Sequence, residues 1–328
     1  MQALSPPSDL IARFRADLEA LATPDRLAVA VSGGPDSLAL LLLAAAAYPG
    51  RIAAATVDHG LREASGWEAL HVEDICNRLG CPHTILSVQV AQGRAGLQGE
   101  ARAARYEALA QWAERERLPV LATAHHLDDQ AETLIMRLAR GAGVGGLGGI
   151  RPSRRQGVLH IVRPLLGWTK AELVHLVART GVEPIDDPSN REPRFDRTAA
   201  RKLMADTALF DPRRLARTAS AAREAEEALD WAAEQLLEDR LTAQGGEWRL
   251  DPSGLPPAFK RRLLVRALAE VRAAHGLPAS ATAGPDQDRL LAALDSGATA
   301  TLAHVLARGG PFWHFRLAPP RRDADQSG

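Results

Sequence analysis

Leu27-Ala-Val-Ala-Val31, Ser32-Gly-Gly-Pro-Asp-Ser37 and Leu38-Ala-Leu-Leu-Leu-Leu43 follow one another directly in the chain. The first block is apolar throughout and predicts a buried strand, and the third predicts a buried helix. Two glycines between them allow a tight turn, in which backbone N–H groups converge at the positive N-terminal end of the helix. Ser32 and Ser37 add hydroxyl groups. The stretch therefore predicts a strand-loop-helix unit with a phosphate site.

Asp36 adds a metal ion to this prediction. A carboxylate beside a bound phosphate repels it unless a cation lies between the two, so we expect Asp36 to be a Mg²⁺ ligand. The alternative is a plain strand-to-helix turn in which Asp36 or Ser37 caps the helix.

Lysine is almost absent from the chain. Only three of the 40 basic residues are lysines, at 170, 202 and 260, and none is followed by Ser or Thr. The Gly-Lys-Ser/Thr loop of common NTPases is therefore missing. A nucleotide site here must hold phosphate without a lysine in its loop.

Apolar runs and amphipathic patterns alternate on both sides of the loop. We expect strands at 26–31, 52–57, 83–88, 120–124 and 158–162, and helices at 36–48, 65–79, 100–116 and 127–139. This alternation is typical of βαβ units. It predicts an α/β fold with a doubly wound, mostly parallel sheet. The glycine-rich stretch 141–149 is expected to be a flexible loop.

The pattern becomes helical near Asp211. Residues 212–241 are rich in Ala, Glu and Arg, and a second helical pattern covers 258–274. We therefore expect a first domain at 1–211, a smaller helical domain at 212–297, and a short tail at 298–328 that holds one strand pair.

The composition is that of a soluble globular protein. The 328 residues include 40 acidic and 40 basic ones, and 46% are hydrophobic. The longest apolar run, 38–48, is shorter than the roughly 20 residues that span a bilayer. Cys76 and Cys81 lack the C-x-x-C spacing of redox motifs. We expect a cytoplasmic protein with reduced thiols and no membrane partner.

A polar run, Thr56-Val-Asp-His-Gly-Leu-Arg62, ends the second predicted strand. The carboxyl ends of parallel strands meet at one edge of a sheet, where such sheets bind ligands. We therefore expect Asp58, His59 and Arg62 beside the nucleotide. The alternative is a loop that merely leaves the strand.

A second polar run, Ala122-Thr-Ala-His-His-Leu-Asp-Asp-Gln-Ala-Glu-Thr133, follows the fourth predicted strand. Asp129 and Glu132 are three residues apart and lie on one helix face at the same edge. One alternative is a helix that uses these acids in its first turn. Another is a zinc site built from histidine and aspartate.

Basic residues gather in two places. Arg102 and Arg105 share one face of the predicted helix at 100–116. Residues 191–223 contain nine basic and four acidic residues, a net charge of +5. Local charge of this kind suits a phosphate backbone, whereas a solvated helix face is the alternative in both places.

The loop at 32–37 resembles the pyrophosphatase loop of the N-type ATP pyrophosphatase superfamily, whose members cleave ATP between the α and β phosphates. Five motifs in order resemble the tRNA(Ile)-lysidine synthetase family, over about residues 26–217, with a linker-like helical segment to about 275. They are Ser-Gly-Gly-Pro-Asp-Ser at 32–37, Asp-His-Gly-Leu-Arg at 58–62, Glu-Ala-Arg-x-x-Arg-Tyr at 100–106, His-His-x-Asp-Asp-Gln-x-Glu-Thr at 125–133 followed by Arg-Gly-x-Gly-x-x-Gly-Leu, and Asp-x-Ser-Asn-x-x-x-x-Phe-x-Arg at 187–197.

The resemblance implies a ligase with its catalytic domain at 1–211 and a linker or tRNA-binding domain at 212–297. The family joins free lysine to C2 of the wobble cytidine in the CAU anticodon of tRNA(Ile), which changes decoding from AUG to AUA. ATP first adenylates the base, pyrophosphate leaves, and the lysine ε-amine then displaces AMP. The residues implied to hold ATP and Mg²⁺ are Ser32, Gly33, Gly34, Pro35, Asp36 and Ser37, with Asp36 on the metal, bordered by Thr56, Asp58, His59 and Arg62.

The implied lysine site rests on three residues. Asp129 and Glu132 match the lysine-recognition acids of the family, and Arg197 matches its Phe-x-Arg arginine, a fork for a carboxylate. With Asp36 they form the predicted catalytic set. The resemblance also assigns Arg102, Arg105, His125 and Arg201 to substrate binding. His125 and His126 are candidates on chemistry alone for the group that deprotonates the amine.

The chain departs from the family pattern at two points. Thr198 stands where the family has Asn, and only some fifty residues follow the linker, so we expect the short form without a full acceptor-stem domain. Family members are often dimers, which makes a homodimer possible. The enzymatic alternative is a related tRNA 2-thiolation enzyme, which would need cysteines near the loop. A non-catalytic nucleotide or RNA binder is the other alternative.

Overall fold

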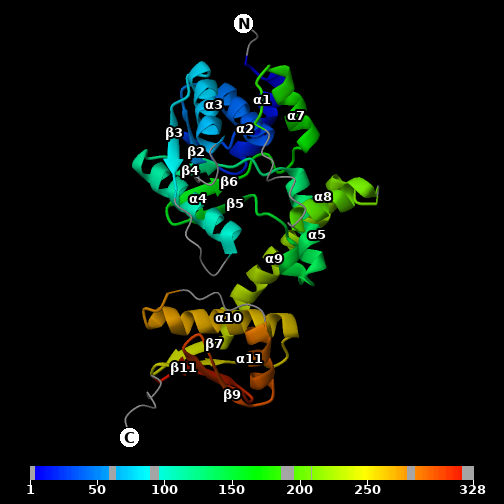
Figure 1. Cartoon of the computed structure of the whole chain (residues 1–328). Coiled ribbons are helices and arrows are strands. Elements are labelled where there is room, and N and C mark those ends of the chain that lie inside the picture. Colours follow the sequence, from blue (N-terminus) through cyan, green and yellow to red (C-terminus); the bar gives the residue numbers. More distant parts are fainter. Residues whose placement is uncertain are drawn as a thin grey trace, which may run out of the picture. The chain divides into compact units, whose positions relative to one another are not determined.

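The apolar stretch before the loop forms β1 (Leu27–Ala30), an inner strand of a six-stranded sheet with the order β3-β2-β1-β4-β6-β5 (Figure 1). Its other strands are β2 (Ile52–Asp58), β3 (His83–Ser87), β4 (Val120–Ala122), β5 (Ser153–Gln156) and β6 (Leu159–Val162). The pairs β1-β2, β1-β4, β2-β3 and β4-β6 are parallel, and only β5 runs antiparallel to its neighbour. The predicted α/β fold with a mostly parallel sheet is confirmed.

The computed structural model describes residues 4–58, 64–88, 96–185, 196–207, 209–278 and 285–319. The chain divides into two compact units, Met1–Arg223 and Glu224–Gly328. The predicted boundary at Asp211 lies just before α9 (Pro212–Arg240), whereas the two units divide within that helix. In the described part of the chain, no helix is long and apolar enough to cross a membrane.

Helices cover both faces of the parallel sheet. Leu27 and Val29 pack with α1 (Ser8–Glu19), α2 (Pro35–Ala47), α3 (Ala64–Arg78) and α7 (Lys170–Arg179) in one core cluster. Ala28 faces the other side, where Trp112 of α4 (Gly96–Arg115) is buried. Adjacent strand residues point to opposite faces, which explains this division. The remaining helices of this unit are α5 (Leu127–Ala139), the short α6 (Val144–Leu147) and α8 (Asp196–Asp206).

The second unit contains α10 (Pro257–Ala274), α11 (Pro285–Asp295) and a five-stranded antiparallel sheet with the order β7-β8-β11-β10-β9. Its strands are β7 (Leu241–Gln244), β8 (Glu247–Leu250), β9 (Thr299–Leu302), β10 (Val305–Arg308) and β11 (Trp313–Leu317). The sequence predicted α10 and a strand pair in the tail, but neither α11 nor a sheet of this width. The strands are four or five residues long, too short for a clear alternation of apolar and polar residues.

Candidate active site

The loop between β1 and α2 is held by its own side chains. The Ser32 backbone N–H donates to Ser37 Oγ at 3.1 Å, and Ser37 Oγ donates to the Gly34 carbonyl at 2.9 Å. Gly33 has φ +82°, and a Cβ there would lie 2.2 Å from Ile185 Cδ1. The Ile185 N–H also donates to the Gly33 carbonyl. Only glycine fits this position, and the first N–H groups of α2 are left to face a ligand.

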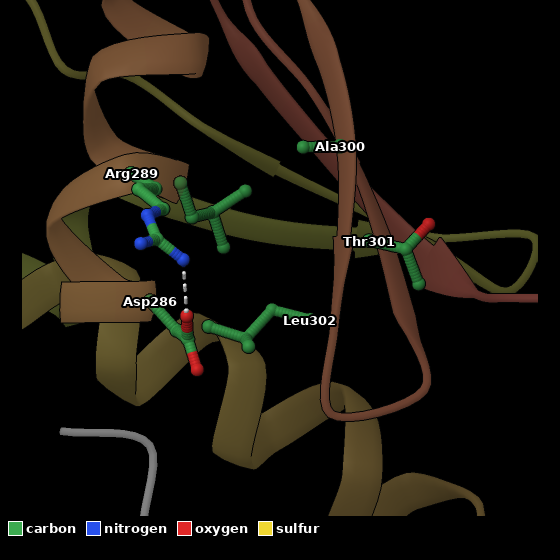
Figure 2. A pocket seen from close by; sticks show the side chains of 6 residues that line it. Asp286, Arg289, Ala300, Thr301 and Leu302 are labelled. Carbon is green, nitrogen blue, oxygen red and sulfur yellow. Dashed lines mark hydrogen bonds and ion pairs between the residues drawn. The ribbon is translucent and has the colours of Figure 1, made fainter. Parts of the chain in front are cut away.

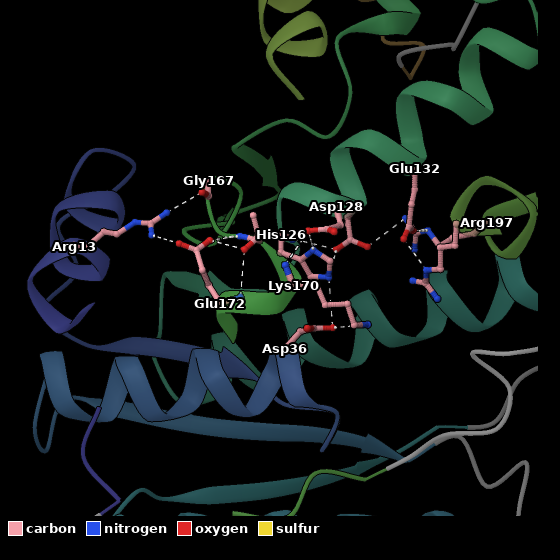
Figure 3. A network of polar contacts seen from close by, with 12 residues as sticks. Arg13, Asp36, His126, Asp128, Glu132, Gly167, Lys170, Glu172 and Arg197 are labelled. Atoms are coloured by element: carbon pink, nitrogen blue, oxygen red, sulfur yellow. Dashed lines mark hydrogen bonds and ion pairs between the residues drawn. The ribbon is translucent and has the colours of Figure 1, made fainter. Parts of the chain in front are cut away.

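Asp36, in the first turn of α2, is surrounded by cations. Its Oδ2 lies 3.5 Å from His126 Nε2 and 3.7 Å from Lys170 Nζ (Figure 3). Its Oδ1 is buried and has no hydrogen-bond partner among the described residues. Burial raises the pKa of Asp36, but His126, Lys170 and Arg201 outweigh it and lower the pKa below its usual value. Asp36 is therefore a carboxylate with one free oxygen, as a Mg²⁺ ligand must be.

His126, just before α5, lies among three carboxylates. Its Nε2 is 3.6 Å from Asp129 Oδ2 and 3.5 Å from Asp36 Oδ2, and its Nδ1 is 3.7 Å from Asp128 Oδ2. The backbone N–H of His126 donates to Asp129 Oδ2, which fixes the start of α5. Burial lowers the pKa of His126, but the three acids raise it to about 10. Being already protonated near neutral pH, His126 is a poor proton acceptor and acts as an internal cation.

Glu132 lies one turn further along α5 and is held by α8. Arg201 Nε donates to Glu132 Oε1 at 2.6 Å, and Arg197 Nε lies 3.0 Å from Oε2 without hydrogen-bond geometry. Arg197 Nη2 also reaches to 4.0 Å from Asp129 Oδ1. Burial raises the pKa of Glu132, although both arginines oppose it. The four residues of the predicted catalytic set, Asp36, Asp129, Glu132 and Arg197, therefore lie together. Glu132 orients Arg197 and Arg201.

His125 contacts groups other than the carboxylates around His126. Its Nδ1 shares a hydrogen bond of 3.0 Å with Thr123 Oγ1. Burial lowers the pKa of His125 to about 3, with Arg163, Arg102 and Arg197 adding to the effect of burial and Asp129 opposing it. A neutral imidazole of such low basicity is also a poor candidate for the base.

Arg102 lies on α4 next to Tyr106. Its guanidinium carbon is 5.1 Å from the centre of the Tyr106 ring, and Arg154 of β5 is 4.4 Å from the same ring. Arg102 and Arg105 are both exposed. β5, which the sequence did not predict because Ser153–Gln156 is polar, therefore brings a further arginine to the predicted pair.

The segment that follows β2 is only partly described. Thr56 is buried and shares a hydrogen bond of 2.9 Å with His83 Nε2, and Asp58 ends β2. His59 and Arg62 lie outside the described residues, as does the Asp-x-Ser-Asn part of the last motif. Their predicted places beside the nucleotide stay predictions.

The glycine-rich stretch is anchored to α5. Gln130 exchanges two hydrogen bonds with the Ile150 backbone, and Arg137 Nη1 donates to the carbonyls of Gly146 and Gly149. A Cβ on Gly149 would lie 2.3 Å from Gln130 Oε1. The sequence predicted a flexible loop here, whereas the structure shows a backbone tied down by two side chains of one helix.

The start of α7 carries Lys170 and is fixed at several points. Thr169 and Glu172 form a reciprocal cap, in which the Thr169 N–H donates to Glu172 Oε2 at 2.7 Å. Arg13 of α1 pairs with Glu172 at 2.9 Å, and the Lys170 N–H donates to Asp128 Oδ2 at 2.8 Å. Figure 3 shows the Lys170 side chain directed toward Asp36. Sequence reasoning missed Lys170, whose only local signal is the Thr-x-x-Glu cap around it.

Comparison with known proteins identifies this arrangement. The PP-loop domain model matches residues 8–207. A tRNA(Ile)-lysidine synthase of Novosphingobium aromaticivorans is 45% identical over 321 residues, which cover 96% of each chain. A second one, from Zymomonas mobilis, is 40% identical over 304 residues, 91% of this chain and 90% of the relative. The chain belongs to the tRNA(Ile)-lysidine synthase family.

The resemblance seen in the five motifs is thereby confirmed, and with it an ATP-binding PP-loop enzyme of the ligase type that acts in tRNA modification. Among solved structures, a U34-tRNA thiolase from Methanococcus maripaludis has a TM-score of 0.53 at 17% identity, over 67% of this chain and 78% of that one. This likeness concerns the fold alone.

The two cysteines lie away from the loop. Cys76 is near the end of α3 and Cys81 precedes β3, and both are buried. The start of a parallel strand lies at the edge of the sheet opposite its carboxyl end. Neither Cys76 nor Cys81 is therefore placed at the loop, where sulfur chemistry would need a cysteine.

No group of three or more His, Cys, Asp or Glu side chains in the described ranges has the arrangement of a metal site. Mg²⁺ at a triphosphate needs less, because one or two carboxylates plus phosphate oxygens and water complete its shell. Asp36 with its free Oδ1 fits that requirement.

One pocket of the second unit has a different character. A hollow of about 330 Å³ between α11 and β9 is lined by an exposed ion pair, Arg289 with Asp286, and by Leu290, Ala300, Thr301 and Leu302 (Figure 2). None of the predicted site residues lines it.

Proposed function

We propose that this enzyme ligates L-lysine to C2 of the wobble cytidine, position 34, in the CAU anticodon of tRNA(Ile). ATP adenylates the cytidine and pyrophosphate leaves. The lysine ε-amine then displaces AMP, which gives lysidine and changes decoding from AUG to AUA. The relatives' name, tRNA(Ile)-lysidine synthase, supports lysidine formation in tRNA(Ile) as the reaction.

One observation carries the detailed proposal. His126 Nε2 is within 3.6 Å of both Asp36, on the ATP side, and Asp129, on the predicted lysine side. The two sites therefore share a single buried cation. An amine bound at Asp129 lies next to the nucleotide, so an adenylated base can be attacked without leaving the pocket.

ATP is bound by the loop. Gly33, Gly34 and the first N–H groups of α2 approach the phosphates, and Ser32 and Ser37 supply hydroxyls. Asp36 holds Mg²⁺, which when bound offsets the charge that develops on the departing pyrophosphate. The hydrogen bonds among Ser32, Ser37 and Gly34 hold the loop in its conformation before ATP binds.

Lysine is bound between α5 and α8. Asp129 attracts an ammonium group, and Arg197 binds the substrate carboxylate through its guanidinium fork. Glu132 acts mainly through the arginines, since both of its oxygens already face Arg197 and Arg201. Neither histidine suits the role of proton acceptor for the ε-amine, because His125 is too weakly basic and His126 is already protonated near neutral pH.

The anticodon loop is bound by basic residues of the first unit. Arg213, Arg214 and Arg217 are exposed on the first turns of α9, and Lys202 is exposed on α8. Together with Arg102, Arg105 and Arg154 they supply cations for a phosphate backbone. The wobble base leaves its stack to enter the site, at a low cost in an anticodon loop.

A single assay tests the proposal. The protein is incubated with ATP, Mg²⁺, a tRNA(Ile) transcript with the CAU anticodon, and each radiolabelled amino acid in turn. We expect incorporation of lysine alone, with one AMP and one pyrophosphate per lysine, and none into a transcript with a changed wobble base. Lack of lysine incorporation, or incorporation of another amino acid, contradicts the proposal.

The same assay addresses the thiolation alternative, since incorporation of sulfur instead of lysine would support it. Light scattering tests the homodimer suggested by the family resemblance, and cell fractionation tests the expected cytoplasmic location. Both stay predictions.

A further inference from the structure

The loop of this enzyme lacks a lysine, yet the structure brings one to it from another helix. Lys170 is the first residue of α7, and its Nζ lies 3.7 Å from Asp36 Oδ2. Pro35 and three α7 residues, Val174, Val177 and Ala178, line one small pocket, so α7 runs beside the loop. The packing of α7 therefore brings Lys170 to the loop, where the lysine of a Gly-Lys-Ser/Thr loop would come from the loop itself.

Its backbone is fixed and its ammonium group is accessible. The Lys170 N–H is bound by Asp128, and the preceding residue, Thr169, is locked to Glu172. The side chain is 45% exposed. A long flexible stem on a rigid base can therefore turn its three N–H donors from Asp36 toward a ligand without moving α7.

The charge balance at the loop calls for such a cation. Asp36, Asp128 and Asp129 supply three negative charges, and His126 supplies one buried positive charge that cannot reach out to a ligand. Arg197 and Arg201 are engaged with Glu132. A triphosphate brings further negative charge, of which one Mg²⁺ cancels only a part.

We propose that Lys170 binds the β and γ phosphates of ATP and then the departing pyrophosphate, and so replaces the lysine that the loop lacks. This inference rests on the proposed function. Before ATP binds, Lys170 pairs with Asp36. When ATP binds, its ammonium group moves to the phosphates and leaves Asp36 to the metal ion.

The scarcity of lysine makes a direct test possible. The folded full-length chain is treated briefly with a trace of an acylating reagent, and the acylation rates at Lys170, Lys202 and Lys260 are measured by peptide mass spectrometry. Inorganic pyrophosphate with Mg²⁺ is expected to slow acylation of Lys170 about tenfold. Lys260, which pairs with Asp295 at 2.7 Å in the second unit, is the internal reference whose rate should not change.

The Asp36→Asn variant, tested without metal, distinguishes direct phosphate binding by Lys170 from a role limited to holding Asp36. If Lys170 touches phosphate itself, pyrophosphate still protects it in this variant. If Lys170 acts only through Asp36, protection disappears, and the proposal is overturned. Unchanged acylation of Lys170 in the wild-type chain at saturating pyrophosphate overturns it as well.

Affinity gives a second readout. By calorimetry with inorganic pyrophosphate and Mg²⁺, Lys170→Ala should bind about tenfold more weakly, Lys170→Arg should recover most of the affinity, and Lys260→Ala, which alters the second unit, should bind like wild type. Equal affinities in Lys170→Ala and wild type contradict the inference, provided that thermal unfolding shows the variant folded.

These results are independent of the ligation assay. Wild-type protein that ligates lysine but shows no protection of Lys170 would refute this inference alone. Protection of Lys170 in a protein that ligates no lysine would refute the proposed function instead.

Discussion

At the carboxyl edge of the parallel sheet, the side chains of His126 and Glu132 are 2% and 3% exposed, whereas Asp230 on α9, paired with Arg262 and Arg266 of α10, is 45% exposed. Both places are clusters of ion pairs. Water solvates the Asp230 carboxylate, so each of its two pairs contributes little. At the sheet edge burial removes that solvation from His126 and Glu132, so their charges depend on a neighbour or a ligand. The comparison distinguishes a cluster that supports structure from one prepared for binding.

The largest effect is expected from Asp36→Asn. The change keeps the shape of the side chain but removes the charge that holds Mg²⁺, so pyrophosphate release should fall by about 10³-fold. Release is measured with a coupled pyrophosphate assay. Asp128→Asn is the matched control, because it also removes a carboxylate from His126 but lies outside the loop. A similar fall in both variants would show that loss of the His126 contact, not of the metal ligand, is responsible.

The buried cation predicts a pH dependence of stability. The pKa of His126 is raised from 6.5 to about 10 in the folded protein. Its contribution is therefore complete below about pH 6.5 and is lost as pH rises through about 10, up to at most about 5 kcal/mol. Urea unfolding of metal-free protein between pH 6.5 and 10 should show this decrease in unfolding free energy.

His126→Gln serves as the reference for that experiment. It should be less stable near neutral pH and should lose most of the slope between pH 6.5 and 10. A slope as steep as that of the wild type would assign the effect to other groups.

A smaller effect is expected from Arg197→Lys. Lysine keeps the charge beside Glu132 but lacks the planar fork that suits a carboxylate. The KM for lysine should rise about tenfold, while the KM for ATP changes less than twofold. Arg201→Lys is the control, because Arg201 pairs with the same Glu132 and is not assigned to the substrate carboxylate. If Arg197→Lys raised the KM for lysine and the KM for ATP equally, the assignment of Arg197 to the substrate carboxylate would be wrong.

The smallest effect is expected in the second unit. Asp230→Asn weakens the pairs with Arg262 and Arg266, but water replaces the lost charge, so the unfolding free energy should change by less than about 1 kcal/mol. Chemical denaturation measures it. A loss of several kcal/mol would show that this cluster, too, depends on buried charge.

Local patterns predicted much of the first unit. The apolar blocks around Ser32-Gly-Gly-Pro-Asp-Ser37 identified β1, the loop and α2, because each is encoded by neighbouring residues. The three-residue spacing of Asp129 and Glu132 placed them correctly on one side of α5. Polar β5 and the short strands of the second unit beyond one pair in the tail carry no such pattern and were missed.

The charge states of the site could not be read from the sequence. His126 was considered as a base, but contact with Asp36, which is far away along the chain, makes it a cation. Lys170 was noted only as a residue without a following Ser or Thr, because its position beside the loop depends on the packing of α7. Such roles arise from tertiary contacts, which sequence spacing does not contain.

The support of α7 by Arg13 sets an order of assembly. Arg13 and Glu172 are separated by 159 positions in the chain, and Trp168 donates to Asp17 across a separation of 151. Contacts of such range form late, because a long loop must close first. A nascent chain can form the loop and α2 early, but it gains a fixed Lys170 only after α7 has left the ribosome and met α1. The phosphate loop is therefore completed only after most of its own domain has been synthesised.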